Sequence, residues 1–254
     1  MLLFDSHLHL DDAAFAADRD AVLARARTAG VIGLVTVGTS VRSSHAAIDL
    51  AGVYPEVYAT VAIHPQEAHT ATDDAMHALH TLATHPKVVA IGETGLDFSR
   101  PDPPRDVQRE AFRRHIHLSR ELGLPLIIHC RAPHDELFEM LQGALVPSVV
   151  MHAFSGSVDF AVACVAAGYA ISLAGPVTFH NARATADVAR TVPLERLLVE
   201  TDAPGLAPEP VRGRRNEPAH LMYTVARIAA LRDLPPDEVA RATSQNAQRV
   251  YRVP

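Results

Sequence analysis

Eight short apolar runs constrain the fold of this 254-residue chain more than any other feature. Each run is rich in β-branched residues, ends in polar residues and is followed by an amphipathic helical pattern. Some, such as residues 88–91, are apolar throughout, as strands buried on both faces of a sheet are. We expect strands over residues 2–9, 31–38, 57–63, 88–93, 125–130, 147–152, 169–173 and 196–201.

The stretches between these runs predict helices. Repeated strand–helix units imply a parallel sheet, and eight of them in about 250 residues predict a closed (β/α)8 TIM barrel. An open doubly wound sheet is the alternative, but its first turn is normally rich in glycine, and residues 7–10 contain none. No linker or repeat divides the chain, so we expect one domain over residues 1–254. The helices are expected over residues 13–29, 43–53, 73–84, 105–122, 135–141, 159–167, 182–191, 219–231 and 236–251.

Composition narrows the class of protein. The formal net charge of −6 argues against a broad basic surface for nucleic acid, although a local arginine patch stays open. The two cysteines, Cys130 and Cys164, lie in apolar stretches and are too few for a cysteine-rich zinc site. With no signal peptide and no apolar run of membrane-spanning length, we expect a cytoplasmic protein with no membrane partner, and a monomer.

Potential metal ligands stand where six of the eight strands end. The carboxyl ends of the strands are where an α/β barrel carries its chemistry. Alone, each residue has an alternative: a hydrogen-bonded core histidine, a surface glutamate, or a helix N-cap in the case of Asp202. Their recurrence at matching positions favours a metal site. The residues are His7, His9, His64, Glu93, His129, His152 and Asp202.

The His7–His9 pair differs from a second His-x-His pair, His115 and His117. On a strand, residues two apart share a face, so His7 and His9 can converge on one ion. The second pair lies in a helical pattern, where such residues diverge. We interpret it as a solvated or packed feature of the helix surface.

Imidazoles with carboxylates suit a divalent ion such as zinc, manganese or magnesium. Six ligands exceed what one catalytic zinc requires, so we expect two ions that clamp the attacking and leaving oxygens of a displacement at phosphorus. Glu93 is the candidate bridge between them. One ion would take His7, His9 and Asp202, and the other His129 and His152. Asp202 could also accept the proton of the water that the ions activate.

These residues lie in motifs that resemble the TatD-type metal-dependent deoxyribonucleases of the amidohydrolase superfamily. The motifs follow the order of that family along almost the whole chain. They cover residues 4–9, 63–65, 91–98, 128–131, 152–156, 198–204, 212–218 and 246–249.

The resemblance implies a (β/α)8 barrel of the metallo-dependent hydrolase type that cleaves phosphodiester bonds of DNA, and sometimes RNA, from the 3′ end. It places the family's metal ligands on the six residues assigned to the two ions, and the active-site histidine beside the substrate phosphate on His64. Differences at Ala62, Ala132-Pro133 and Ala153 concern the pocket wall, and therefore substrate preference.

Residues 203–217 form a long, proline-stiffened connection that carries Arg212, Arg214 and Arg215. Long loops of compact domains are often functional. Arg212 is the strongest candidate for a phosphate contact because Gly213 and Asn216 accompany it in its motif, and Arg131 is a weaker one. We therefore expect His64, Arg131, Arg212 and Asn216 to contact the substrate, and Asp202, Glu93 and His64 to act in catalysis. Phe98, Phe154 and Phe179 could stack a base or pack the barrel top.

Three functions fit these patterns. The first is a 3′-5′ exodeoxyribonuclease acting on single-stranded DNA or 3′ ends with two divalent ions. The second keeps the metals but cleaves an ester or amide, including deacylation of mis-aminoacylated tRNA. The third is a non-catalytic binding module, which is disfavoured because the ligand set is complete.

Overall fold

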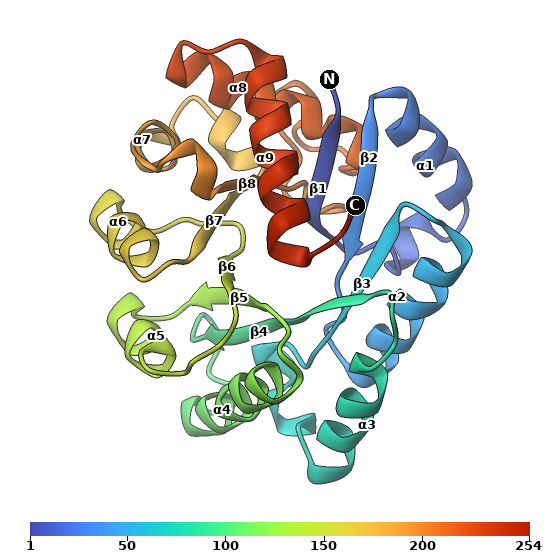
Figure 1. The fold of residues 1–254 in the computed structure, drawn as a ribbon, viewed down its shortest axis with the longest axis vertical. Helices are drawn as coiled ribbons and strands as arrows, with labels where there is room; N and C mark the ends of the chain where they lie inside the picture. The colour runs from blue at the N-terminus through green and yellow to red at the C-terminus, as the bar shows by residue number, and fades with distance from the viewer. The chain divides into compact units, whose positions relative to one another are not determined.

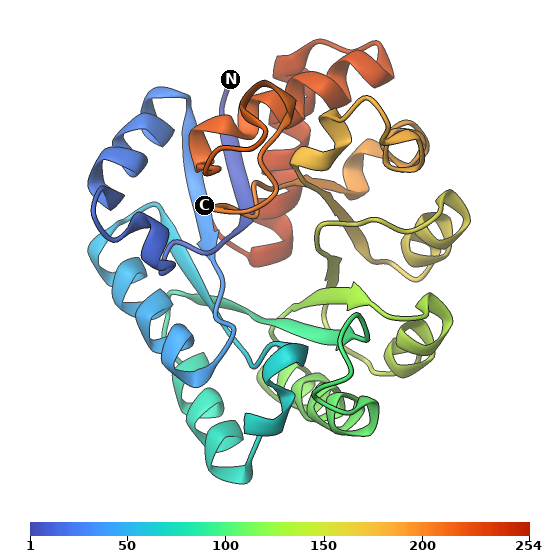
Figure 2. The same cartoon turned by 180° about the vertical axis from the view of Figure 1, so that it is seen from behind.

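The computed structural model describes residues 1–254 and contains one eight-stranded sheet with the strands in chain order (Figures 1 and 2). The pairs β3–β4, β4–β5, β5–β6 and β7–β8 are parallel. Parallel strands that alternate with helices in chain order have the (β/α)8 architecture that the sequence predicts. The strands are β1 (Leu3–Leu8), β2 (Val31–Thr36), β3 (Val57–Val61), β4 (Val88–Asp97), β5 (Leu126–Arg131), β6 (Val149–Met151), β7 (Ala170–Leu173) and β8 (Leu197–Val199).

Nine α-helices and six short 3-10 helices alternate with the strands or, in the case of η5, η6, α8 and α9, follow the last strand. None of the α-helices combines the length and apolar character needed to cross a membrane. The α-helices are α1 (Arg19–Thr28), α2 (Val41–Val53), α3 (Asp73–Ala83), α4 (Arg105–Leu122), α5 (His134–Leu141), α6 (Val158–Ala166), α7 (Arg183–Thr191), α8 (Leu221–Arg232) and α9 (Pro236–Tyr251). The 3-10 helices are η1 (Ala13–Phe15), η2 (Pro65–Thr70), η3 (Gly175–Thr178), η4 (Leu194–Arg196), η5 (Glu209–Val211) and η6 (Pro218–His220).

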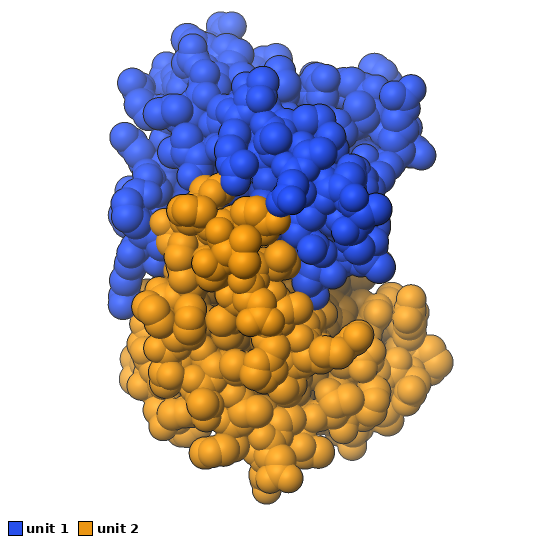
Figure 3. Space-filling model, turned by 90° about the vertical axis from the view of Figure 1, so that its right-hand side faces the viewer, with its two compact units in different colours: residues 1–35, 153–254 blue, residues 36–152 orange.

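The chain forms two compact units, which Figure 3 colours separately. Unit 1 contains Met1–Val35 and Ala153–Pro254, and unit 2 contains Thr36–His152. Each unit has its own buried strands and helices. The organisation of residues 1–254 as one domain stays a prediction.

In unit 2, the apolar runs form the strands that were expected, and they are buried. Leu126, Ile127 and Ile128 of β5 have no exposed surface. Helix α4 packs on β4 and also lies beside η2 (Figure 2). It ends at Gly123, whose left-handed backbone (φ 66°) closes the helix as glycine commonly does. This packing brings α4 against the residues that follow β3.

In unit 1, the carboxyl-terminal helix supports the first and last strands. Helix α9 packs on β1 and β8 (Figure 1). The Tyr251 hydroxyl donates a hydrogen bond to the Ser6 carbonyl at 3.0 Å. The Asn246 amide donates to the carbonyls of Leu194 and Leu197, both at 2.8 Å. The matched motif at residues 246–249 therefore anchors the start of β8.

The structure corrects several element boundaries, and most strands are shorter than expected, as with β6 at Val149–Met151. The helix expected over 13–29 divides into η1 and α1, because the Asp12 side chain caps a separate turn at Ala14. The final strand is shorter than 196–201 and ends at Val199. Strand β4 runs to Asp97, past residue 93, because Thr94 to Asp97 pair in register with residues 128–131 of β5. The apolar sequence pattern ends at Glu93, but the pairing of β4 with β5 continues to Asp97.

Candidate metal centre

His7, His9 and Asp202 form a cluster in unit 1, which we call the first half-site. The Nε2 atoms of His7 and His9 lie 3.6 and 3.3 Å from Oδ1 of Asp202. Two backbone bonds hold this arrangement, from Asp202 N to His7 O at 2.9 Å and from His9 N to Ala203 O at 2.8 Å. The two rings lie close together, with centroids 5.2 Å apart, although only His7 lies in β1 and His9 follows its end. Asp202 has φ 53°, a left-handed conformation that aspartate tolerates better than most residues.

A buried carboxylate, Asp5, ties the first half-site to the end of β8. It accepts hydrogen bonds from the Thr201 amide at 2.9 Å, the Thr201 hydroxyl, and the His7 amide at 3.4 Å. Burial raises the pKa of Asp5 to about 7 against the effect of these donors. Asp5 thus holds the backbone beside Asp202 against the backbone of His7.

Glu200, two residues before Asp202, has a different task. Its carboxylate is fully buried and accepts hydrogen bonds from the Ala153 amide at 2.8 Å and the Ser172 hydroxyl at 2.5 Å. It therefore braces β7 and β8 rather than offering a ligand.

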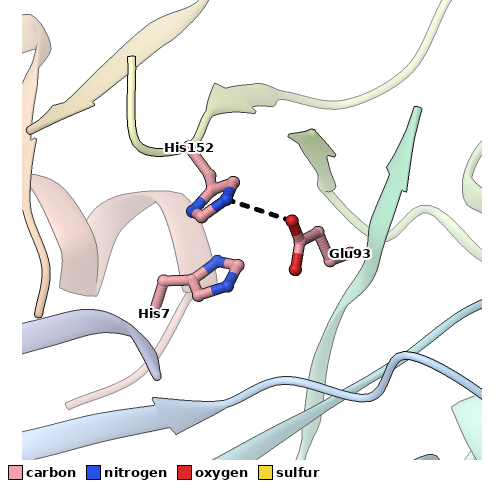
Figure 4. A group of neighbouring side chains, drawn as sticks. All are labelled: His7, Glu93 and His152. Carbon is pink, nitrogen blue, oxygen red and sulfur yellow. Dashed lines mark ion pairs between the residues drawn. The ribbon is translucent and has the colours of Figure 1, made fainter. Parts of the chain in front are cut away.

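Four side chains of unit 2, namely Glu93, His64, His129 and His152, form what we call the second half-site. One carboxylate oxygen, Oε1 of Glu93, is at its centre. His129 Nδ1 lies 2.6 Å from it and His64 Nε2 lies 3.6 Å from it. The third imidazole, His152, approaches with Nε2 at 3.0 Å, the ion pair drawn in Figure 4. Only 3% of Glu93 is exposed, so these imidazoles provide the polar surroundings that a buried carboxylate requires.

The electrostatics of the second half-site keep Glu93 ionised. Burial opposes ionisation, but the imidazoles of His152, His129 and His64 outweigh it and hold the pKa of Glu93 well below its usual range. Burial likewise opposes charge on His129, and its carboxylate neighbours Asp97 and Glu93 outweigh this and raise its pKa. A carboxylate oxygen surrounded by imidazole nitrogens is a combination of ligand atoms that suits a divalent cation.

Glycines beside Glu93 bring β4 close to β5. Gly95 has φ 142°, and a Cβ there would collide with the His129 carbonyl. Gly92 has φ 155°, and a Cβ there would meet Ile127. Only glycine fits both the backbone conformation and the close approach. Gly92 and Gly95 therefore allow β4 to approach β5 closely enough for Glu93 to contact His129.

His64 is held by its own helix and by a distant histidine. Its Nδ1 accepts a hydrogen bond from the Gln66 amide at 3.1 Å, which caps η2 and directs Nε2 toward Glu93. The preceding residue, Ile63, donates its amide to His115 Nε2 at 3.0 Å. His115 in turn donates from Nδ1 to the Ala111 carbonyl at 2.7 Å. Burial lowers the pKa of His115 to about 4, so the ring stays neutral.

The second His-x-His pair thus needs a correction. The two rings lie on α4 and diverge as predicted, and His117 is exposed. His115 is not a surface feature: it is fully buried and fixes the chain before His64. Its partner is 52 residues away in sequence, a separation that no local pattern reveals.

The predicted substrate residues occupy different environments. The Arg212 side chain is 55% exposed, and its guanidinium lies 4.2 Å from the centroid of the Phe179 ring. Arg131 is exposed at the end of β5. Asn216 is fully buried, with its amide on the Thr201 carbonyl and its oxygen on the Glu217 amide. Those bonds assign Asn216 to holding the loop, and its substrate contact stays a prediction.

Other arginines and aromatic residues of these motifs serve the scaffold. Arg215 binds Asp18 through two nitrogens, at 2.7 and 2.8 Å, and also the Ala14 carbonyl. Phe154 is buried and stacks on Phe160. The interpretation of Phe154 as barrel packing is therefore the better one. Of the three arginines of the loop, Arg215 is anchored, whereas Arg212 and Arg214 are exposed, with Arg212 3.6 Å from Glu209.

Sequence reasoning missed two supporting carboxylates, Asp5 and Asp97. Both lie in the quoted motifs, each inside or beside a run that is otherwise apolar. Asp5 lies in the strand predicted over residues 2–9, where a carboxylate is rare without a partner, and that signal could have found it. Asp97 lies beyond the strand predicted over residues 88–93, so no such signal marks it.

Parallel strands in (β/α)8 order, with histidines and carboxylates clustered where strands end, define the class of metal-dependent hydrolases. The family model of TatD related DNases matches residues 4–252, and this chain belongs to that family. This match confirms the resemblance that the sequence motifs indicated. The chain is an enzyme of the metal-dependent hydrolase type.

Similar proteins cover the whole chain. A Mycobacterium tuberculosis protein named uncharacterized metal-dependent hydrolase TatD is 43% identical over 98% of this chain and 97% of its own length. A Musicola paradisiaca protein named 3′-5′ ssDNA/RNA exonuclease TatD is 38% identical over 99% of this chain and 98% of its own. The crystal structure of YJJV, a TatD homologue from Escherichia coli, superimposes with a TM-score of 0.94 at 34% identity and covers 99% of this chain and 98% of that one. These matches confirm the TIM-barrel fold.

Proposed function

We propose that this enzyme is a 3′-5′ exonuclease that hydrolyses phosphodiester bonds of single-stranded nucleic acid with the help of divalent metal ions. The observation that supports this proposal most directly is the ionised, buried Glu93 surrounded by three imidazoles. Several relatives, at 36–38% identity over nearly the whole chain, are named ssDNA/RNA exonucleases, which supports a nucleic-acid substrate.

The side chains present fit divalent metals. We propose that His7, His9 and Asp202 hold one ion, that His129 and His152 hold a second, and that Glu93 is the ligand shared by both. Zinc, manganese and magnesium all suit imidazole and carboxylate donors. When bound, such ions supply Lewis-acid polarisation of a phosphoryl oxygen and lower the pKa of water.

The two acidic ligands divide the work. Asp202 exposes 19% of its side chain and Glu93 only 4%. Asp202 is therefore the carboxylate that can exchange a proton with the attacking water, in the role of general base. Glu93, ion-paired and buried, keeps its charge throughout.

His64 and the arginines address the phosphate. The Nε2 atom of His64 points into the second half-site and can donate to a non-bridging phosphate oxygen. Arg212 and Arg131 are exposed cations that can bind the next phosphates along the strand. Because the chain carries a net charge of −6, such contacts are local and suit a strand end rather than a long duplex footprint.

The test uses metal-stripped protein and a 5′-labelled single-stranded DNA oligonucleotide, with magnesium, manganese or zinc added in turn. We expect a ladder that shortens from the 3′ end only when metal is present. Glu93→Ala controls for contaminating nucleases, and Glu121→Ala, a carboxylate change on the exposed face of α4, is the matched control that keeps activity. Absence of cleavage with every ion, in protein that binds metal, would contradict the nuclease. Turnover of aminoacyl esters or amides by that protein would then identify the alternative hydrolase.

A further inference from the structure

Asp97 is a buried carboxylate that the catalytic proposal does not use. It ends β4, opposite Arg131 of β5, and only 1% of it is exposed. Its Oδ1 accepts hydrogen bonds from the Ser99 amide at 2.9 Å and the Ser99 hydroxyl at 2.5 Å. Its Oδ2 accepts from Gln66 Nε2 at 2.8 Å and interacts with His129 Nε2 at 3.2 Å. None of these four donors is a lysine or arginine. Two of them belong to the second half-site or its support: the His129 ring, and Gln66, which also bonds His64.

The backbone of Asp97 is fixed independently of its carboxylate. Gln108 of α4 accepts from the Asp97 amide and donates to the Asp97 carbonyl, both at 2.8 Å. A further bond from Gln108 to the Pro103 carbonyl at 3.0 Å holds the glutamine itself. Asp97 is thus a rigid support, because both its main chain and its side chain are held by buried hydrogen bonds.

The imidazole of His129 lies between two carboxylates. Its Nδ1 faces Oε1 of Glu93 at 2.6 Å, and its Nε2 faces Oδ2 of Asp97 at 3.2 Å. An ionised carboxylate only accepts hydrogen bonds, so Asp97 holds the proton of His129 on Nε2. Glu93 is ionised as well and accepts from Nδ1 in the metal-free protein. A cation bound beside Glu93 would take the place of the proton on Nδ1, whereas Asp97 would keep the proton on Nε2.

We propose that Asp97 is a positioning residue: it holds His129 in the Nε2–H tautomer and so selects Nδ1 as the metal-ligating atom. The inference rests on the proposed assignment of His129 as a ligand. Carboxylates that accept from the second nitrogen of a ligating histidine fix its ring and raise its basicity, and their loss commonly weakens metal binding 10–100-fold.

The same oxygen of Asp97 also connects His129 with His64. Gln66, which donates its side-chain amide to Oδ2 of Asp97, donates its backbone amide to Nδ1 of His64. The rings of His64 and His129 meet edge to face with centroids 4.5 Å apart. Asp97 therefore sets the relative position of a proposed ligand and of the histidine proposed to contact the phosphate.

The test compares Asp97→Asn with Asp106→Asn, an exposed aspartate on α4 that makes the same change of charge. Zinc affinity is measured by competition with a chromophoric chelator in metal-stripped protein. We expect a roughly 10–100-fold loss in Asp97→Asn and no loss in Asp106→Asn, while the melting temperatures of the metal-free proteins stay within a few degrees of wild type. Unchanged affinity would overturn the inference.

A double-mutant cycle separates positioning from a general structural role. In a His129→Ala background, Asp97→Asn should cost no further zinc affinity, because its effect passes through the imidazole. An additive loss would overturn the inference. If Asp97→Asn does not fold, nitrogen-15 spectra of the histidines in wild-type zinc protein decide: we expect His129 protonated at Nε2 alone, and protonation at Nδ1 would contradict us. These readouts need no DNA cleavage, so the positioning role can hold even if the nuclease proposal fails.

Discussion

The two half-sites use the same side-chain types in different surroundings. In the first, His9 and Asp202 have side chains 24% and 19% exposed, and a carboxylate on a left-handed backbone faces two imidazoles. In the second, the central Glu93 side chain is 4% exposed and His152 is 5% exposed. The second cluster is therefore preorganised around a buried charge, and the first is more open to solvent. The difference teaches that clusters of the same residue types can differ in how far solvent reaches their carboxylates, which bears on the separate roles proposed for Glu93 and Asp202.

The substitutions with the largest expected effect replace the carboxylates of Glu93 and Asp202 with the corresponding amides. Glu93→Gln removes the charge at the centre of three imidazoles, and we expect loss of both metal binding and detectable hydrolysis. Asp202→Asn removes the proposed general base, and we expect hydrolysis to fall by about 10²–10⁴-fold. Single-turnover rates and zinc content measure the two effects.

The variants should differ in metal content, and that difference sharpens the comparison. Asp202→Asn should keep the ion of the second half-site, because none of the ligands of unit 2 changes. Wild-type hydrolysis in Asp202→Asn would remove this residue from its catalytic role. A full complement of metal in Glu93→Gln would contradict the central position given to that carboxylate.

Removal of metal should occur in two phases. His9 and Asp202 are more exposed than the side chains around Glu93, so the first half-site should release an ion to a chelator faster than the second. Zinc content followed against time in excess chelator measures this, and the fast phase should be absent in Asp202→Asn. A single phase of release in wild type would break the distinction between an open and a closed half-site.

The pH dependence of stability should report His115, which supports only the second half-site. Burial lowers its pKa from 6.5 to about 4, so the unfolded chain binds a proton that the folded chain does not. Its contribution is complete above about pH 6.5 and is lost as the pH falls toward 4, by up to ~3 kcal/mol. Urea unfolding of wild type and His115→Gln at pH 8 and 5 measures it. An equal loss in both proteins would contradict the assignment.

The smallest effect distinguishes two arginines of the loop after β8. Arg212→Ala should raise KM for an oligonucleotide roughly tenfold with kcat little changed, because a charge-assisted phosphate contact is lost. Arg215→Ala is the matched control: its guanidinium already binds Asp18 and the Ala14 carbonyl, so KM should not move. Equal changes in KM for both variants would mean that the loop as a whole, rather than Arg212, recognises the phosphate.

Much of the fold was readable because its signal is local. Apolar runs such as 88–91 and 125–128 become the buried first parts of the strands β4 and β5. Glu93 and His129, which follow these runs, lie within the strands rather than at their ends. The spacing of His7 and His9 predicted that they would lie together, and they do, although His9 follows the end of β1 and is held by the Ala203 carbonyl. The first half-site forms only where the ends of β1 and β8 lie side by side. The sequence indicates that proximity only through the order of its strand–helix units.

The limits of the sequence appear where a side chain bonds to a residue far along the chain. Asp97 is 32 residues from His129, His115 is 52 from Ile63, and Asp5 is 196 from Thr201. The sequence alone determined the strand–helix alternation and the histidines and carboxylates that follow the apolar runs, because both can be read along one segment. Only the tertiary structure decided which nitrogen of His129 faces Glu93, that Asn216 is buried and that His115 is a support. Such roles depend on hydrogen bonds and burial, which exist only once distant segments have packed together.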